Sequence, residues 1–236
     1  MKQHSLSESP KAISLHRQIS LPAASLTQEM LTERCRDFFL ANKNHTDPSH
    51  DLVHIDRVNR NQSRIAVIEG GDPEILIPAA LLHDVINYPK NDPRRSHSAG
   101  ESATLAATFL ANLDGYPYHK IPAVTEAILR HSFSANLPAR TLEDKIIQDA
   151  DRLESIGLVA LMRTFSTCGS LGRQLFDPED PFCENRAPAP SRYGLDVYYS
   201  RLLKVEKLLN TETAKQLVVE RARSMRGFIN GLRSEM

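Results

Sequence analysis

The chain of 236 residues contains no tryptophan, and aromatic residues make up only 6% of it. Its core must therefore be built mainly from aliphatic side chains, and the 41% hydrophobic fraction is enough for one. No stretch reaches the apolar length that crosses a bilayer. The first residues also lack the apolar segment of a signal peptide, so we expect no membrane partner.

An excess of charge of one sign is lacking too. Lysine plus arginine and aspartate plus glutamate each number 29, so the formal net charge is zero. A protein that binds nucleic acid through its overall charge would be basic, so we expect no stable nucleic-acid partner. A local basic pocket for phosphate groups remains compatible with this balance.

Cysteines are few and widely spaced, at Cys35, Cys168 and Cys183. Their odd number and the lack of a CxxC pair argue against a disulfide framework. We therefore expect buried or incidental thiols in a reducing cytoplasm. The sequence also lacks a glycine-rich loop followed by Lys and Ser or Thr, which excludes a P-loop enzyme.

The hydrophobic pattern is helical, with neither strand alternation nor an internal repeat, so we predict an all-α fold. Residues 1–26 are rich in Ser, Pro, Gln and His and are predicted to form a flexible tail before a single domain over 27–236. Residues 166–196 have little periodicity and are predicted to form a long loop, interpreted as a lid or rim segment. Helices are predicted over about 26–40, 51–68, 73–85, 98–113, 122–131 and 142–165, the last with a break left open after Gly157, and again from near Leu195 and from Thr211.

Two adjacent polar residues, His83 and Asp84, interrupt the most apolar of these predicted helices. A buried ionised carboxylate is costly unless it is paired or bound to a cation. A metal ion would account for both residues, and a buried Asp–Arg pair is the alternative.

His54 and Asp151 lie on two other apolar helices. Asp149 and Asp151 are two residues apart, so only one of them faces the same centre. We predict that it is Asp151, and that Asp149 orients a ligand histidine. Asp51 is expected to cap its helix or hold an imidazole, while His50, at the loop junction, is expected to be exposed. Two imidazoles and two carboxylates suit a divalent cation of borderline to hard character.

His54, the His83-Asp84 doublet and Asp151 resemble the metal-binding signature of the HD-domain phosphohydrolase superfamily. The segments SHDLVHIDRV, LLHDVINYPKNDP, ILRHSFS and QDADRLESIG are similar to its YedJ/YpgQ-like branch, and the resemblance extends over roughly residues 28–236. It implies an all-helical domain in which His54, His83, Asp84 and Asp151 bind a divalent metal cation: Mn, Mg or another transition metal.

The sequence departs from parts of the superfamily pattern. Some HD nucleotidases have a glutamate shortly after the doublet, where this chain has Asn87. The extra histidines of two-metal HD phosphodiesterases are not all present. One metal ion is therefore favoured over two.

A phosphohydrolase needs cations that stabilise the charge on the phosphoryl oxygens. Lys90, Arg94 and Arg95 follow the doublet in a loop, and Lys90 and Arg94 are predicted to bind substrate; an ordinary solvated basic loop is the alternative. His131 resembles the histidine of the branch's HSFS motif, which implies a contact to phosphate, proton donation to the leaving group or a second metal. Alternatively, it only interacts with the dipole of its helix.

These residues together predict a metal-dependent phosphohydrolase that cleaves a phosphoester or phosphoanhydride bond of a small phosphorylated metabolite, with a nucleotide as the preferred substrate. His83, Asp84 and His131 are its predicted catalytic residues. One alternative is a non-catalytic nucleotide-binding sensor module. Another is a di-iron oxygenase, which the missing histidines disfavour. A homo-oligomer is compatible with the sequence but not specified by it.

Overall fold

The computed structural model describes residues 26–44, 50–89, 92–132 and 136–236. The predicted tail and Lys90 lie outside these residues, apart from Leu26. The described part of the chain is helical and contains no strand, which confirms the all-α prediction. Its main helices are α1 (Gln28–Asn42), α2 (Leu52–Glu69), α3 (Pro73–Leu82), α4 (Ser98–Ala111), α5 (Ile121–His131), α6 (Leu142–Arg152), α7 (Leu158–Ser170), α8 (Leu203–Val205) and α9 (Glu212–Glu235).

The helices begin where the sequence supplies capping side chains. The Thr27 hydroxyl accepts a hydrogen bond from the backbone N–H of Met30, and the Thr211 hydroxyl accepts one from Ala214. Asp72 caps α3, whose first residue is Pro73. Each of these groups satisfies or removes a backbone donor that would otherwise be unpaired in the first turn. The predicted starts at Thr27, Pro73 and Thr211 are therefore confirmed.

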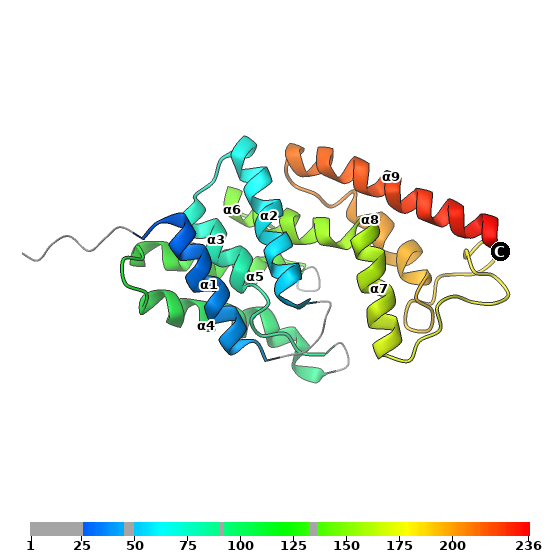
Figure 1. Cartoon of the computed structure of the whole chain (residues 1–236), viewed down its shortest axis with the longest axis horizontal. Coiled ribbons are helices and arrows are strands. Elements are labelled where there is room, and N and C mark those ends of the chain that lie inside the picture. Colours follow the sequence, from blue (N-terminus) through cyan, green and yellow to red (C-terminus); the bar gives the residue numbers. More distant parts are fainter. Residues whose placement is uncertain (1–25, 45–49, 90–91, 133–135) are drawn as a thin grey trace, which may run out of the picture.

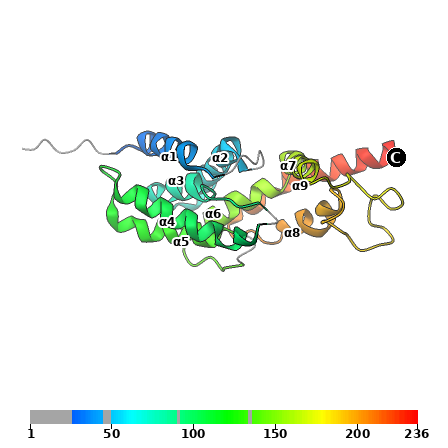
Figure 2. The ribbon, with the colours of Figure 1, turned by 90° about the horizontal axis from the view of Figure 1, so that it is seen from below.

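Helix α3 forms the centre of the core. All its residues from Leu76 to Leu82 are buried, and it packs against α1, α2, α5 and α6. Figure 1 shows α1 to α6 together in one half of the molecule, and Figure 2 shows the same grouping from below. A helix that is apolar all round must be enclosed by other helices. The polar residues that follow α3 in the chain therefore lie in the interior.

The predicted helix over 142–165 is two helices. Helix α6 ends at Arg152, a 3₁₀ turn covers Leu153–Ser155, and α7 starts after Gly157. Gly157 has a φ of 101°, and a Cβ there would lie 3.2 Å from the Arg221 side chain. Both the conformation and the close approach require glycine, so the chain changes direction at this point.

The predicted loop over 166–196 begins later than expected, because α7 continues to Ser170. Its remaining part is held by its own polar groups. The Arg186 guanidinium binds the buried Asp196 carboxylate through two hydrogen bonds of 2.5 and 2.9 Å. Helicity resumes at the π-helix Tyr198–Leu202, close to the predicted Leu195. The interpretation of residues 166–196 as a lid or rim segment stays a prediction.

None of the helices in the described ranges is long and apolar enough to cross a membrane.

Candidate metal centre

His83 lies at the C-terminal end of α3 with its ring fixed by the backbone. Its Nδ1 donates a hydrogen bond to the carbonyl oxygen of Ala80, 2.8 Å away, so the lone pair is on Nε2. The Nε2 atom is buried and has no hydrogen-bond partner in the described part of the chain. Burial lowers the pKa of His83 to about 4. The ring is therefore neutral at physiological pH, the form in which imidazole binds a metal ion.

His54 is presented by the first turn of α2. The Asp51 carboxylate caps this helix by accepting a hydrogen bond of 3.0 Å from the His54 backbone N–H. Both ring nitrogens of His54 are buried, and neither has a hydrogen-bond partner among the described residues. Burial also lowers the pKa of His54. A second neutral imidazole with unpaired polar atoms is thus held in the interior.

The two carboxylates complete the group around these histidines. Asp84 Oδ2 lies 3.5 Å from His83 Nε2 and 3.9 Å from His54 Nε2. Asp151 Oδ1 lies 3.6 Å from His54 Nε2 and 4.0 Å from His83 Nε2. Ligand atoms about 2.0–2.2 Å from one ion in a tetrahedral site would be about 3.4 Å apart, so these four histidine–carboxylate distances are close to those of ligands that share one ion. The structure brings together the four residues predicted as ligands, and their donor atoms fit a divalent metal.

The aspartate two residues earlier faces the other way. The Asp149 carboxylate accepts hydrogen bonds from the backbone N–H groups of Asn210 and Thr211 and from the Thr211 hydroxyl. It holds the start of α9. The prediction that Asp149 orients a ligand histidine is therefore wrong, because its carboxylate oxygens accept hydrogen bonds from the residues just before α9.

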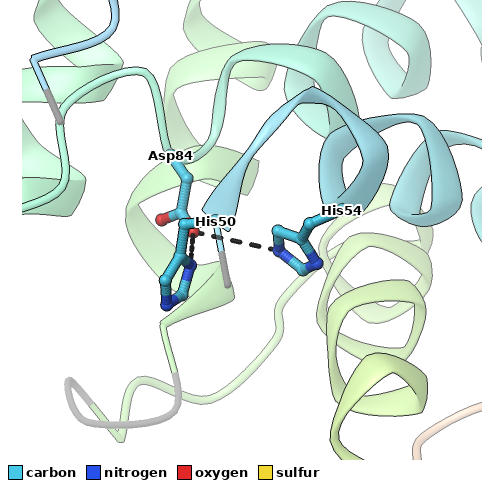
Figure 3. A group of neighbouring side chains, drawn as sticks. All are labelled: His50, His54 and Asp84. Carbon is cyan, nitrogen blue, oxygen red and sulfur yellow. Dashed lines mark hydrogen bonds and ion pairs between the residues drawn. The ribbon is translucent and has the colours of Figure 1, made fainter. Parts of the chain in front are cut away.

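His50 is closer to the centre than its position in the sequence suggested. Its side chain is only 19% exposed, and its Nδ1 lies 2.8 Å from Asp84 Oδ2 (Figure 3). The expectation that His50 is exposed is wrong. No periodic signal in the sequence identifies it, because His50 precedes the N-cap Asp51 and lies outside α2.

His131, the last residue of α5, lies on the other side of Asp84. Its Nδ1 donates to the carbonyl oxygen of Ile128 at 2.5 Å, and its Nε2 lies 3.7 Å from Asp84 Oδ1. Burial alone would lower the pKa of His131, but the neighbouring Asp84 carboxylate outweighs burial and raises it. His131 is therefore brought to the same centre as the doublet.

A cavity of about 290 Å³ opens beside Asp84 and His131. Its other lining residues come from the segment after the doublet, the start of α4 and the end of α5: Asn87, Arg95, Ser96, Ser98, Ala99 and Ser132. The Arg95 guanidinium donates to the carbonyl oxygen of Tyr88 at 2.6 Å, which fixes it on this wall. The wall of the cavity therefore carries the fixed guanidinium of Arg95 and several serine hydroxyl groups next to the candidate metal ligands. A separate cavity of about 300 Å³ between α2 and α9 is lined by none of the candidate metal ligands.

Arg94, predicted to bind substrate, has a different environment from Arg95. Its guanidinium pairs with Asp92 at 2.8 Å and lies over the Tyr88 ring, and its side chain is 61% exposed. It is not among the residues that line the cavity. A contact between Arg94 and substrate stays a prediction.

Arg57 on α2 forms an ion pair with Glu154 at 2.7 Å. Arg152 donates instead to the carbonyl oxygen of Leu208 at 2.6 Å. Arg163 on α7 donates to the carbonyl oxygen of Glu154 at 3.2 Å.

The part of the chain that carries this centre matches a known family. Residues 51–156 match the family model described as HD domain. Over 198 residues the chain is 31% identical to YpgQ of Bacillus subtilis (strain 168). The matched region covers 81% of this chain and 87% of YpgQ. The chain belongs to the HD-domain superfamily. The matched segment includes every residue of the candidate metal centre except His50, which directly precedes it.

Several solved structures share the fold of this chain. Bacillus subtilis YpgQ in complex with ADP has a TM-score of 0.65 at 26% identity and covers 89% of this chain and 98% of that one. An HD-superfamily hydrolase from Bacillus thuringiensis has the same TM-score at 28% identity, with 89% and 98% covered. A protein from Lactobacillus plantarum has a TM-score of 0.68 at 26% identity, with 88% and 97% covered. This HD-domain protein therefore has the fold of HD-superfamily hydrolases, including the helices beyond residue 156.

Proposed function

We propose that this HD-domain protein is a metal-dependent phosphohydrolase that cleaves a phosphoester or phosphoanhydride bond of a small phosphorylated metabolite, preferentially a nucleotide. One observation carries the proposal. The Nε2 atoms of His54 and His83 are buried without a hydrogen-bond partner in the described chain and converge on the carboxylates of Asp84 and Asp151. Unpaired polar atoms in a core are costly, and a bound cation satisfies all of them at once.

His54, His83, Asp84 and Asp151 would hold the cation. A bound divalent ion lowers the pKa of a water molecule and neutralises charge on phosphoryl oxygens. The donor set of two imidazoles and two carboxylates is compatible with Mn, Mg or another transition metal. His83, at the end of the buried helix α3, and Asp84, in the turn that follows it, would orient the reacting groups through the cation that they hold.

The chain's own residues account for the remaining requirements of hydrolysis. His131 Nε2 lies at the wall shared by Asp84 and the cavity, where the protonated ring can donate its proton to the leaving oxygen. Arg95 supplies a fixed positive charge on the same wall for a phosphate group. Contacts of substrate with Lys90 and Arg94 remain part of the proposal.

Two observations support a nucleotide as the substrate. The relative YpgQ has been crystallised in complex with ADP. In addition, the described wall of the cavity is polar and includes Arg95 and three serines, which suits a phosphate chain.

The test is a hydrolysis screen with metal-free protein reloaded with Mn²⁺, Mg²⁺, Co²⁺, Ni²⁺ or Zn²⁺. Substrates are nucleoside mono-, di- and triphosphates and sugar phosphates, with release of phosphate and pyrophosphate measured separately. We expect turnover with at least one metal and its loss in the His83→Ala/Asp84→Ala double variant.

Turnover that survives in the double variant would refute the assignment of the site. Tight nucleotide binding without turnover under every metal would instead support a non-catalytic nucleotide-binding module. Two irons per chain by elemental analysis would favour a di-iron oxygenase.

A further inference from the structure

His50 approaches the metal centre from the segment just before α2. Its Nδ1 lies 2.8 Å from Asp84 Oδ2, and the two side chains are 19% and 13% exposed. An ionised carboxylate can only accept, so His50 Nδ1 is the donor of this hydrogen bond. Figure 3 shows the rings of His50 and His54 on two sides of the Asp84 carboxylate.

The oxygen that His50 contacts is the one that faces the candidate ligands. Asp84 Oδ2 is 3.5 Å from His83 Nε2 and 3.9 Å from His54 Nε2, whereas Oδ1 is directed to His131. A carboxylate oxygen has two lone pairs, so Oδ2 can accept from His50 with one and direct the other to a cation.

Asp84 also needs support from outside its own helix. Helix α3 ends at Leu82, and Asp84 lies in the turn that follows. The carboxylate is attached to the chain through two rotatable side-chain bonds, and the helix no longer restricts them. A directional hydrogen bond from the segment before α2 therefore limits the orientations of Oδ2.

We propose that His50 is a positioning residue for the Asp84 carboxylate: its Nδ1–H holds Oδ2 in the orientation in which Asp84 binds the cation. This inference rests on the metal site of the proposed function. Groups that hydrogen-bond to metal ligands in this way typically contribute about 10- to 100-fold to metal affinity or activity. His50 thereby links the ligand presented by α2, His54, with the ligand that follows α3, Asp84.

The test uses the full chain and Mn²⁺ alone, without substrate. Free Mn²⁺ is followed by electron paramagnetic resonance during a titration of metal-free protein. We expect His50→Ala to weaken Mn²⁺ binding about 10- to 100-fold. We expect His50→Asn to bind nearly as well as the wild type, because the Asn amide nitrogen is separated from Cβ by the same number of bonds as imidazole Nδ1. The exposed His119 supplies the matched control, His119→Ala, which should not change the affinity.

Rescue by asparagine separates positioning from two other roles. If His50 only supported the fold, His50→Ala would lower the melting temperature of the metal-free protein and leave Mn²⁺ affinity unchanged. If His50 were itself a metal ligand, His50→Asn would weaken binding as much as His50→Ala and change the absorption spectrum of the Co²⁺-loaded protein. Either result would overturn the proposal, as would a wild type that binds no divalent cation. A wild type that binds Mn²⁺ but hydrolyses nothing would refute only the proposed function.

Discussion

The Arg57 guanidinium on α2 donates two hydrogen bonds, 2.7 and 3.1 Å long, to the carboxylate of Glu154, which follows α6. The Glu154 side chain has no exposed surface, and it also accepts a hydrogen bond of 3.0 Å from Asn61. Its Oε2 lies 3.9 Å from His54 Nδ1, on the side of the ring away from the metal ligands. The pair therefore joins α2, which carries His54, to the end of α6, which carries Asp151.

This buried pair predicts a large loss of stability when its acidic member is removed. Glu154→Ala should lower the free energy of unfolding by about 3–5 kcal/mol, because it leaves the partly buried Arg57 without its acceptor. Urea unfolding at neutral pH measures the loss. Glu220→Ala is the control, since the Glu220 side chain is 78% exposed, and should change stability by no more than about 0.5 kcal/mol. An equal loss of unfolding free energy in both variants would show that the buried pair adds no net stability.

The same carboxylate predicts a dependence of stability on pH. Burial alone would raise the pKa of Glu154, but His54 and Arg57 outweigh it and lower the pKa from 4.5 to about 2. A carboxyl group whose pKa is lower in the folded state stabilises the protein fully above its unfolded pKa and loses that contribution as pH falls towards the folded pKa. The advantage of the wild type over Glu154→Gln should therefore be constant above about pH 5 and shrink from pH 4.5 towards pH 2. Urea unfolding of both proteins across this range measures it, and a gap that does not change with pH would contradict the prediction.

Metal binding should stabilise the fold, because the four candidate ligands come from α2, the end of α3 and α6. A ligand that binds only the folded state adds about 2.7 kcal/mol at a concentration of 100 times its Kd. Mn²⁺ should therefore raise the melting temperature of the wild type and of His119→Ala, and excess chelator should reverse the rise. His83→Ala/Asp84→Ala should show no rise in calorimetry. An equal rise in the double variant would place the ion elsewhere.

Arg95 and Arg94 are neighbours in the sequence with different environments, so they form a matched pair. Arg95 lines the cavity beside Asp84, whereas Arg94 is paired with Asp92 and 61% exposed. A charge-assisted hydrogen bond to a phosphate is worth about 1.5–3 kcal/mol, so Arg95→Ala should lower kcat/KM for the hydrolysed nucleotide about 10- to 100-fold. Arg94→Ala should have a much smaller effect.

Melting temperatures of both variants show whether Arg95→Ala, which also loses a contact to Tyr88, remains folded. The opposite order of effects on kcat/KM would restore Arg94 as the residue that binds phosphate.

Much of the fold follows from local features of the sequence. The helix starts at Thr27, Pro73 and Thr211 depend on caps within a few residues, and the burial of α3 follows from its continuous apolar composition. The break at Gly157 remained open because a glycine alone does not reveal its φ. That value depends on the packing of α7 and α9 around it.

The candidate site, too, could be predicted from the sequence only in part. The sequence alone determined which side chains are too polar for their apolar surroundings, namely His54, His83, Asp84 and Asp151. Only the tertiary structure decided that Asp149 binds the chain just before α9, that His50 contacts Asp84, and that Arg95 rather than Arg94 lines the cavity. The physical reason is the separation in sequence between the residues that interact. Burial of a helix face is encoded by residues three and four apart, whereas the partner of a polar side chain is chosen by segments that meet only when the chain has folded.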